Sequence, residues 1–187
     1  MFYIIIAVVV VLLITVIIIY NTLIRKKNDI ENAFASIDAM LKKRYDQIPA
    51  LVEAVKGYMK YERSLLEDIT ALRTKALSDN LTNEDRVIIE NKILKGLSDI
   101  FVAVEKYPDL KASQNFLHLQ GAINEVEEQL AASRRAFNAA VTTYNNSVET
   151  FPSSILASTM NYKRRTLFEI PESEREKLRA KELINLQ

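Results

Sequence analysis

Residues 1–24 read MFYIIIAVVVVLLITVIIIYNTLI and contain no charged side chain; the first charge of the chain is Arg25. A helix rises about 1.5 Å per residue, so this stretch spans roughly 36 Å, enough to cross a hydrocarbon core about 30 Å thick. Apart from Tyr3 near its start, Thr15 is the only polar residue before Tyr20, and its hydroxyl can bond back to its own helix. The stretch predicts a transmembrane helix that anchors the chain in the bilayer.

A cleaved signal peptide is the alternative interpretation of this run. The run has no basic segment before it, is longer than a typical signal core, and is followed by no small-x-small cleavage site. The chain also contains no cysteine, which excludes disulfide bonds, thiolate metal sites and lipid attachment through a cysteine. A retained anchor is therefore expected.

Three basic residues, Arg25, Lys26 and Lys27, follow the span directly. Basic residues close to a span are retained on the cytoplasmic side of the membrane. The flanks therefore predict a single-pass protein of the cell membrane, with its N-terminus outside and its C-terminal domain in the cytoplasm.

The apolar residues after the span recur at intervals of three and four, which is typical of one face of a packed helix. The first such series is Ile30, Phe34, Ile37, Leu41, Tyr45, Ile48, Val52, Val55 and Met59. Similar series and the breaks between them predict four helical segments, at about residues 25–47, 49–77, 85–106 and 112–151. We therefore predict an all-α fold, in which the N-terminal transmembrane helix is followed by an antiparallel four-helix bundle of long, coiled-coil-like helices.

The chain divides into three predicted parts: a transmembrane anchor at residues 1–24, the helical bundle at 25–152, and a C-terminal segment at 153–187. This last segment is expected to be a packed strap or a partly disordered tail. Its basic triplet, Lys163 to Arg165, is expected to be a solvated loop rather than a lipid headgroup site. The charged end, residues 172–187, is expected to be a solvated tail or a strap, and membrane-surface contact is its alternative.

Pro49 leaves one architectural question open. A proline can occupy the first turn of a new helix, or it can kink one long helix. The apolar series continues in phase through Ile48 and Val52, which favours the kink, whereas four segments of comparable length favour a new helix.

The charged residues around Pro49 form the candidate functional site. Asp46 and Glu53 share a face if the helix continues, and Glu53 stands three residues before Lys56. Pairing among these charges is the simpler interpretation. The functional interpretation is a partner-docking face made of Arg44, Asp46, Pro49, Glu53 and Lys56.

Two other polar sets receive structural interpretations. Asn138 and Asn145 flank the apolar series of the last helix, where buried amides are expected to set the register between helices. Three carboxylates, Glu125, Glu127 and Glu128, are expected to form a solvated helix face.

Catalysis and nucleic-acid binding both lack a signature. His118 is the only histidine, so the paired Glu-x-x-His motifs of a carboxylate-bridged metal bundle cannot be built. The chain has no phosphate-binding glycine loop, nucleophile elbow or zinc spacing. Its 25 Lys and Arg balance 24 Asp and Glu, whereas a nucleic-acid binder needs a clustered basic excess. We therefore predict that the protein is not an enzyme and that it binds no cofactor, metal, nucleic acid or small-molecule substrate.

Several short motifs resemble the LemA family of bacterial membrane-anchored proteins. They are Tyr20-Asn21, Asn28, Ala33-Phe34-Ala35-Ser36-Ile37-Asp38, Leu41-Lys42-Lys43-Arg44-Tyr45-Asp46-Gln47-Ile48-Pro49, Leu51-Val52, Val55-Lys56-Gly57-Tyr58, Glu62, Glu105-Lys106-Tyr107-Pro108-Asp109-Leu110-Lys111-Ala112, Asn115-Phe116, Leu119-Gln120, Phe137-Asn138, Tyr144-Asn145 and Phe151-Pro152. The match covers roughly residues 20–168 in order. Phe34 stands where the family commonly has tryptophan, which we interpret as a core exchange, and the tail beyond Pro171 is longer than usual.

The resemblance implies a transmembrane helix followed by a helical bundle, and it implies no catalytic residues. The predicted function is a membrane-tethered interaction or scaffold protein without catalytic activity, with the bilayer as partner through residues 1–24 and an unknown protein partner. The alternatives are a self-associating structural membrane protein and an accessory protein of a membrane-bound hydrolase.

Overall fold

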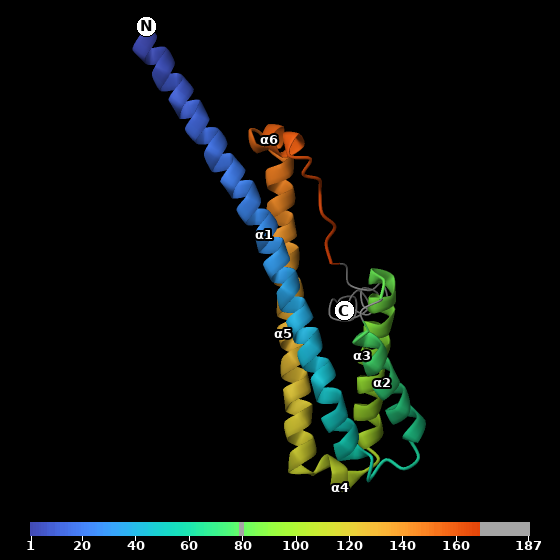
Figure 1. Ribbon diagram of the computed structural model, residues 1–187. Helices are drawn as coiled ribbons and strands as arrows, with labels where there is room; N and C mark the ends of the chain where they lie inside the picture. Colours follow the sequence, from blue (N-terminus) through green and yellow to red (C-terminus); the bar gives the residue numbers. More distant parts are fainter. Residues whose placement is uncertain (79–80, 169–187) are drawn as a thin grey trace, which may run out of the picture. The chain divides into compact units, whose positions relative to one another are not determined.

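The computed structural model describes residues 1–78 and 81–168, and these residues form six helices and no strand (Figure 1). The helices are α1 (Phe2–Val55), α2 (Arg63–Ala76), α3 (Asn83–Val104), α4 (Pro108–Lys111), α5 (Gln114–Glu149) and α6 (Ser153–Thr159). The predicted all-α class is confirmed for this part of the chain. The charged end, residues 172–187, lies outside the described residues.

The chain divides into two compact units. The first unit contains Met1–Ile37 and the described residues from Ala132 onwards, and the second unit contains Asp38–Ala131. Both α1 and α5 contribute one part to each unit. The three-part division predicted from the sequence stays a prediction.

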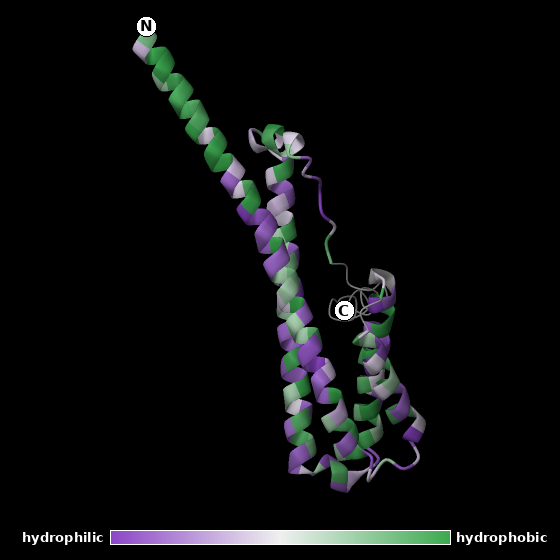
Figure 2. Ribbon diagram, in the orientation of Figure 1, coloured by the Kyte–Doolittle hydropathy of each residue, from purple (hydrophilic) through white to green (hydrophobic). Residues whose placement is uncertain are grey.

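The predicted transmembrane stretch forms the first half of α1. An 18-residue window of this helix has a mean hydropathy of 3.5, and none of the window is buried within the protein. Figure 2 shows the nearly unbroken hydrophobic character of this half before polar residues begin. The hydroxyl of Thr15 donates to the carbonyl of Val11 at 2.8 Å, so the expected back-bond satisfies it. Among the described residues, α1 is the one helix long and apolar enough to cross a membrane.

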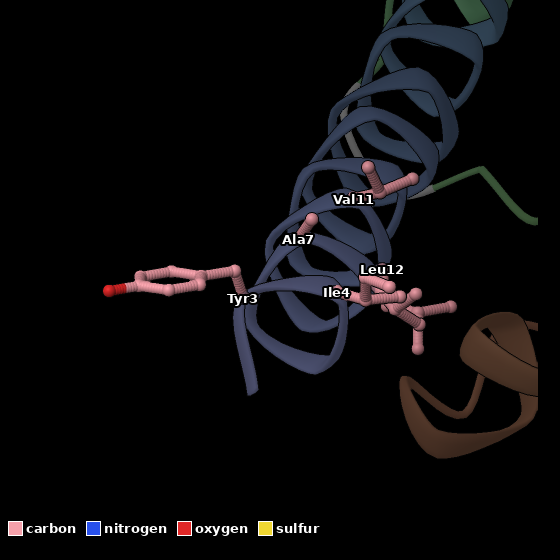
Figure 3. A pocket seen from close by; sticks show the side chains of 6 residues that line it. Tyr3, Ile4, Ala7, Val11 and Leu12 are labelled. Atoms are coloured by element: carbon pink, nitrogen blue, oxygen red, sulfur yellow. The ribbon is translucent and has the colours of Figure 1, made fainter. Parts of the chain in front are cut away.

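A shallow groove runs along this exposed half of α1 (Figure 3). It is lined by Tyr3, Ile4, Ala7, Val8, Val11 and Leu12. The side chains are apolar apart from the Tyr3 hydroxyl, which points away from the helix in Figure 3. Such a surface suits contact with lipid chains rather than with a polar ligand.

The helix continues through Pro49 and ends at Val55, so the helix predicted at residues 49–77 is wrong in its bounds. Proline has no backbone N–H, and the carbonyl of Tyr45, four residues earlier, loses its usual donor. The Nε of Arg73 in α2 donates to that carbonyl at 2.9 Å and replaces the missing bond. The proline is therefore accommodated inside one continuous helix.

The break lies instead between α1 and α2. The last helical bonds run from the Lys56 and Met59 amides to the Val52 and Val55 carbonyls, both at 2.9 Å. Gly57 is a poor helix former, and Met59 then turns into the core, where it is almost fully buried. The apolar spacing from Met59 to Leu66 is seven residues, which matches two helical turns, so the pattern conceals the break.

One apolar core holds the second unit together, and all four long helices contribute to it. Its buried members are Tyr45, Ile48, Leu51, Val55, Met59, Leu66, Ile69, Ile89, Ile93, Leu97, Ile100, Ala103, Val104, Leu110, Phe116 and Ile123. Just before α3 the hydroxyl of Thr82 accepts from the Asp85 amide at 3.1 Å and so caps the start of this helix.

The first unit has a smaller core, formed where α1 passes beside α5. Ile30 packs with Val141 and Tyr144 of α5. Phe34 lies nearby, with its ring centroid 6.0 Å from that of Phe137, but it is about half exposed. The interpretation of Phe34 as a core residue is therefore wrong, because it packs at the edge of this cluster.

Candidate functional site

Arg44, the first residue of the predicted docking face, is fully buried with 0% of its surface exposed. Its guanidinium forms ion pairs with Glu90 of α3 and with Glu127 of α5, the latter at 2.8 Å from Nη1 to Oε1. Arg44 therefore lies inside the second unit and is not part of an exposed face. The charge was placed outside because the sequence pattern does not show which carboxylates reach it.

The buried cluster of Arg44, Glu90 and Glu127 joins three helices. Glu90 is almost fully buried, and the Glu127 side chain is about one third exposed. Glu127 is therefore not on a solvated face, contrary to the expectation for residues 125–128, whereas Glu128 is exposed and Glu125 accepts from Gln129 at 2.7 Å. Buried ion pairs demand good geometry because their desolvation cost rivals their attraction. The cluster thus fixes how α1, α3 and α5 align.

The other four predicted residues remain at the surface of α1. Asp46, Glu53 and Lys56 have side chains more than half exposed, and Pro49 is exposed between them. Lys56 pairs with Glu53 at 2.5 Å, and Asp46 lies 3.9 Å from Arg73. Surface pairs of this kind contribute little to stability, so their charges stay available to a partner. The role of these four residues as a docking face stays a prediction.

Asn138 and Asn145 have partners that the sequence did not suggest. The side-chain amide of Asn145 donates through Nδ2 to the Arg165 backbone carbonyl and accepts through Oδ1 from the Arg165 backbone N–H, both at 2.9 Å. Asn138 makes the same pair of bonds with Phe168, at 3.0 and 2.7 Å. The expected helix-to-helix register bonds are therefore wrong, because both amides hold the extended segment that follows α6.

The spacing of this double contact is consistent with the two chain geometries. Seven residues of helix separate the two asparagines, about 10.5 Å of rise. Three extended residues separate Arg165 from Phe168, about 10 Å. The two asparagines thus act as a two-point clamp for residues 162–168, a strap that is visible beside α5 in Figure 1.

The sequence also missed a contact between two chain turns. The hydroxyl of Tyr107 donates to the Glu62 carboxylate at 2.7 Å, and this bond raises the pKa of the Tyr107 phenol. Glu62 precedes α2 and Tyr107 precedes α4, so the bond ties both junctions together. Both residues belong to the motifs quoted above, but a motif does not reveal which of its members meet.

His118 lies exposed on α5. Within residues 1–78 and 81–168, no group of three or more His, Asp or Glu side chains is placed to hold a metal ion. The charged side chains around Pro49 pair locally or lie near Arg73, and they form no such group in this part of the chain.

Comparison with known proteins agrees with the motifs. A model of the LemA family matches residues 33–181. The chain belongs to the LemA family. Protein LemA of Metamycoplasma hominis is 28% identical over 165 residues, which are 88% of this chain and 75% of that protein.

This LemA-family chain is also similar to two magnetosome proteins. Magnetosome protein MamQ 2 of Paramagnetospirillum magneticum is 21% identical over 175 residues, 80% of this chain and 64% of that protein. Magnetosome protein MamQ of Magnetospirillum gryphiswaldense is 20% identical over 170 residues, 78% of this chain and 62% of that protein. The chain thus spans somewhat less than two thirds of either magnetosome protein.

The LemA-family motifs coincide with structural contacts in this chain. Tyr45 and Ile48 of the longest motif belong to the core of the second unit. Leu110 is fully buried there, while Asn138 and Asn145 hold the strap. The residues that carry the resemblance therefore specify a fold and identify no reaction.

Proposed function

We propose that this LemA-family protein is a membrane-tethered helical interaction protein without catalytic activity. The observation that carries the proposal is α1 itself. An 18-residue apolar window in its first half is wholly exposed, and its last turns, from Tyr45 to Val55, are part of the core of the second unit. One helix thus joins a surface that suits lipid to a folded unit, which in our proposal is an antiparallel four-helix bundle.

Tethering makes a weak docking face effective. A surface held at the bilayer meets other proteins of the same membrane at a high effective concentration. Asp46, Pro49, Glu53 and Lys56 present mixed charges of the kind that gives specificity and faster association. We assign the docking face to these four residues.

Photo-crosslinking tests this assignment on the full-length protein in its own membrane. A photoreactive amino acid at Glu53 is expected to capture a defined partner. The same group at Glu128, an exposed carboxylate on α5, serves as the matched control. Capture from both positions alike, or from neither, would count against the docking face. A product of twice the chain's mass would favour self-association instead.

The flanking charges support one orientation for this tether. With Arg25 to Lys27 retained in the cytoplasm, the N-terminus lies outside the cell membrane and the helical units lie inside. The partner is then a cytoplasmic protein or a protein of the inner leaflet.

A further inference from the structure

The first unit contains a basic pocket of about 380 Å³. It is lined by Lys27 of α1, Tyr144 of α5 and the run 161–165 that follows α6. This run includes the basic triplet that the sequence placed in a solvated loop. The fold brings the triplet to Lys27, which is distant in sequence, so four cationic side chains face one polar hollow.

The pocket wall is held in place by the backbone rather than by loose side chains. Asn161 has a φ of 54°, and its backbone N–H donates to the Ser158 carbonyl at 3.1 Å. The next amide, of Tyr162, donates to the Ala157 carbonyl at 2.9 Å, which completes a Schellman turn at the end of α6. Asparagine tolerates this left-handed conformation better than most residues. The two bonds from Asn145 then fix Arg165 on the far side of the same run.

The charges of the pocket are only partly neutralised. Arg164 pairs with Glu149 at 2.9 Å, and Lys27 lies 3.6 Å from Glu31. No carboxylate among the described residues forms an ion pair with Lys163 or Arg165. The Tyr144 hydroxyl adds a polar group, and burial raises the pKa of this phenol, so it remains a neutral donor. An excess of positive charge with hydroxyl donors suits a phosphate group.

The depth of the pocket places it near the bilayer surface. Lys27 follows Ile24, the last residue of the apolar run, by three residues, or about 5 Å of helix. The headgroup layer on each side of a bilayer is about 5–8 Å thick. Lys27 therefore lies at the level where lipid phosphates are found.

Exposed apolar residues beside the pocket favour a lipid over a free anion. Along α5, residue numbers rise as those of α1 fall: Phe137 faces Phe34, and Ser147 bonds with Lys26. The residues after α5 thus approach the level of the apolar run, where Phe151 is 81% and Ile155 is 62% exposed. Large apolar side chains at this level, next to cations, are the composition of a membrane-surface contact.

We propose that this pocket binds the phosphate headgroup of an anionic phospholipid, while Phe151 and Ile155 enter the adjoining bilayer interface. The proposal rests on the membrane tether proposed above and adds a lipid ligand to it. The exposed cations attract the anionic leaflet, and the clamped run supplies a shaped site for one headgroup.

Thermal unfolding of the full-length protein in neutral detergent micelles tests the site, because a ligand that binds only the folded state raises the unfolding midpoint. Phosphatidylglycerol is expected to raise the midpoint by several degrees, whereas phosphatidylcholine and inorganic phosphate leave it nearly unchanged. The gain should fall as salt is added, since salt screens the charges. Equal gains from both lipids would overturn the proposal. An equal gain from inorganic phosphate would show a free-anion site instead.

A double variant, Lys27→Gln with Lys163→Gln, is expected to abolish the gain from phosphatidylglycerol. The matched control, Lys92→Gln with Lys95→Gln, changes two exposed lysines of α3 in the other unit and should keep it. Loss in both variants would contradict a specific pocket. The comparison of lipids on the unchanged protein needs no variant, so it decides even if the double variant does not fold. Alkaline extraction of membranes separates the two proposals. If the protein stays in the membrane but shows no lipid preference, the headgroup site alone is refuted. If the protein is extracted, the membrane tether is refuted.

Discussion

Arg44 shows how strongly one buried charge constrains this fold. Its guanidinium is fully enclosed and has carboxylate partners from two other helices. Such a cluster contributes little net stability, yet removing one member leaves an uncompensated buried charge. The cluster instead specifies how the three helices align, because its ion pairs form only in one register of α1, α3 and α5.

Arg44→Met is expected to destabilise the protein by about 3 kcal/mol, since it leaves Glu90 buried without a cation. The double variant Arg44→Met with Glu90→Leu should recover much of this loss. Chemical denaturation of the detergent-solubilised full-length chain measures both. Lys43→Met, an exposed neighbour, is the control and should change stability by less than about 0.5 kcal/mol. A loss no larger than that of the control would show that the cluster does not form.

The bond between Tyr107 and Glu62 predicts a pH dependence. A phenol with a raised pKa in the folded state binds its proton more tightly than in the unfolded chain. The stabilisation is complete below the ordinary value of 10.0 and is lost as the pH rises through the higher folded value. Unfolding midpoints measured from about pH 8 to 11 should fall less steeply for Tyr107→Phe than for the native chain. Tyr58→Phe, on an exposed ring, should keep the native slope, and identical slopes for all three would rule out the coupling.

At the scale of helices, α1 accommodates Pro49 because α2 supplies the hydrogen bond that the proline cannot donate. The Tyr45 carbonyl accepts from Arg73 instead of from a backbone N–H. Arg73→Leu should therefore cost about 1–3 kcal/mol, as expected for a buried acceptor left without a donor. In a Pro49→Ala background the restored N–H replaces Arg73, and the same change should cost about 1 kcal/mol less.

Denaturation of the four proteins of this cycle measures the coupling. Asp46→Asn is the control for the second contact of Arg73, which lies 3.9 Å from the Asp46 carboxylate. This change should have little effect on stability. Additive effects of the Pro49 and Arg73 changes would mean that the bond from Arg73 to the Tyr45 carbonyl does not compensate for the proline.

The strap is the other element whose contacts can be tested singly. Asn145→Ala removes both bonds to Arg165 and should loosen residues 163–167 of the strap. Trypsin is then expected to cleave after Lys163, Arg164 or Arg165 several-fold faster than in the native protein, because local opening exposes the chain. Asn146→Ala, at the exposed neighbouring position, should leave the cleavage rate unchanged. Equal rates in the two variants would show that the clamp does not hold the strap.

At the scale of the whole molecule, local patterns predicted the helical class, and long-range contacts escaped prediction. The uncharged apolar run identified the span, and apolar spacing identified most of the core, because both signals depend on residues that are close together in sequence. The turn after Val55 was missed because the spacing stays in phase across it. The burial of Arg44 and the clamp by Asn138 and Asn145 were missed because their partners lie 20 to 83 residues away in sequence. Four of the five residues predicted for the docking face do lie at the surface, where Lys56 pairs locally with Glu53 and Asp46 lies 3.9 Å from Arg73 of α2.

The orientation of the protein in the membrane determines which partners can reach it, and the absence of cysteine makes it measurable. Ser78→Cys places a single thiol at an exposed site of the second unit, and Phe2→Cys places one at the start of the span. A membrane-impermeant maleimide should label the Phe2 variant in intact cells and the Ser78 variant only after lysis, because Arg25 to Lys27 retain the helical units inside. Labelling of the Ser78 variant in intact cells would reverse the orientation and direct the partner search to the cell envelope. Labelling of both variants only after lysis would show that α1 does not cross the membrane.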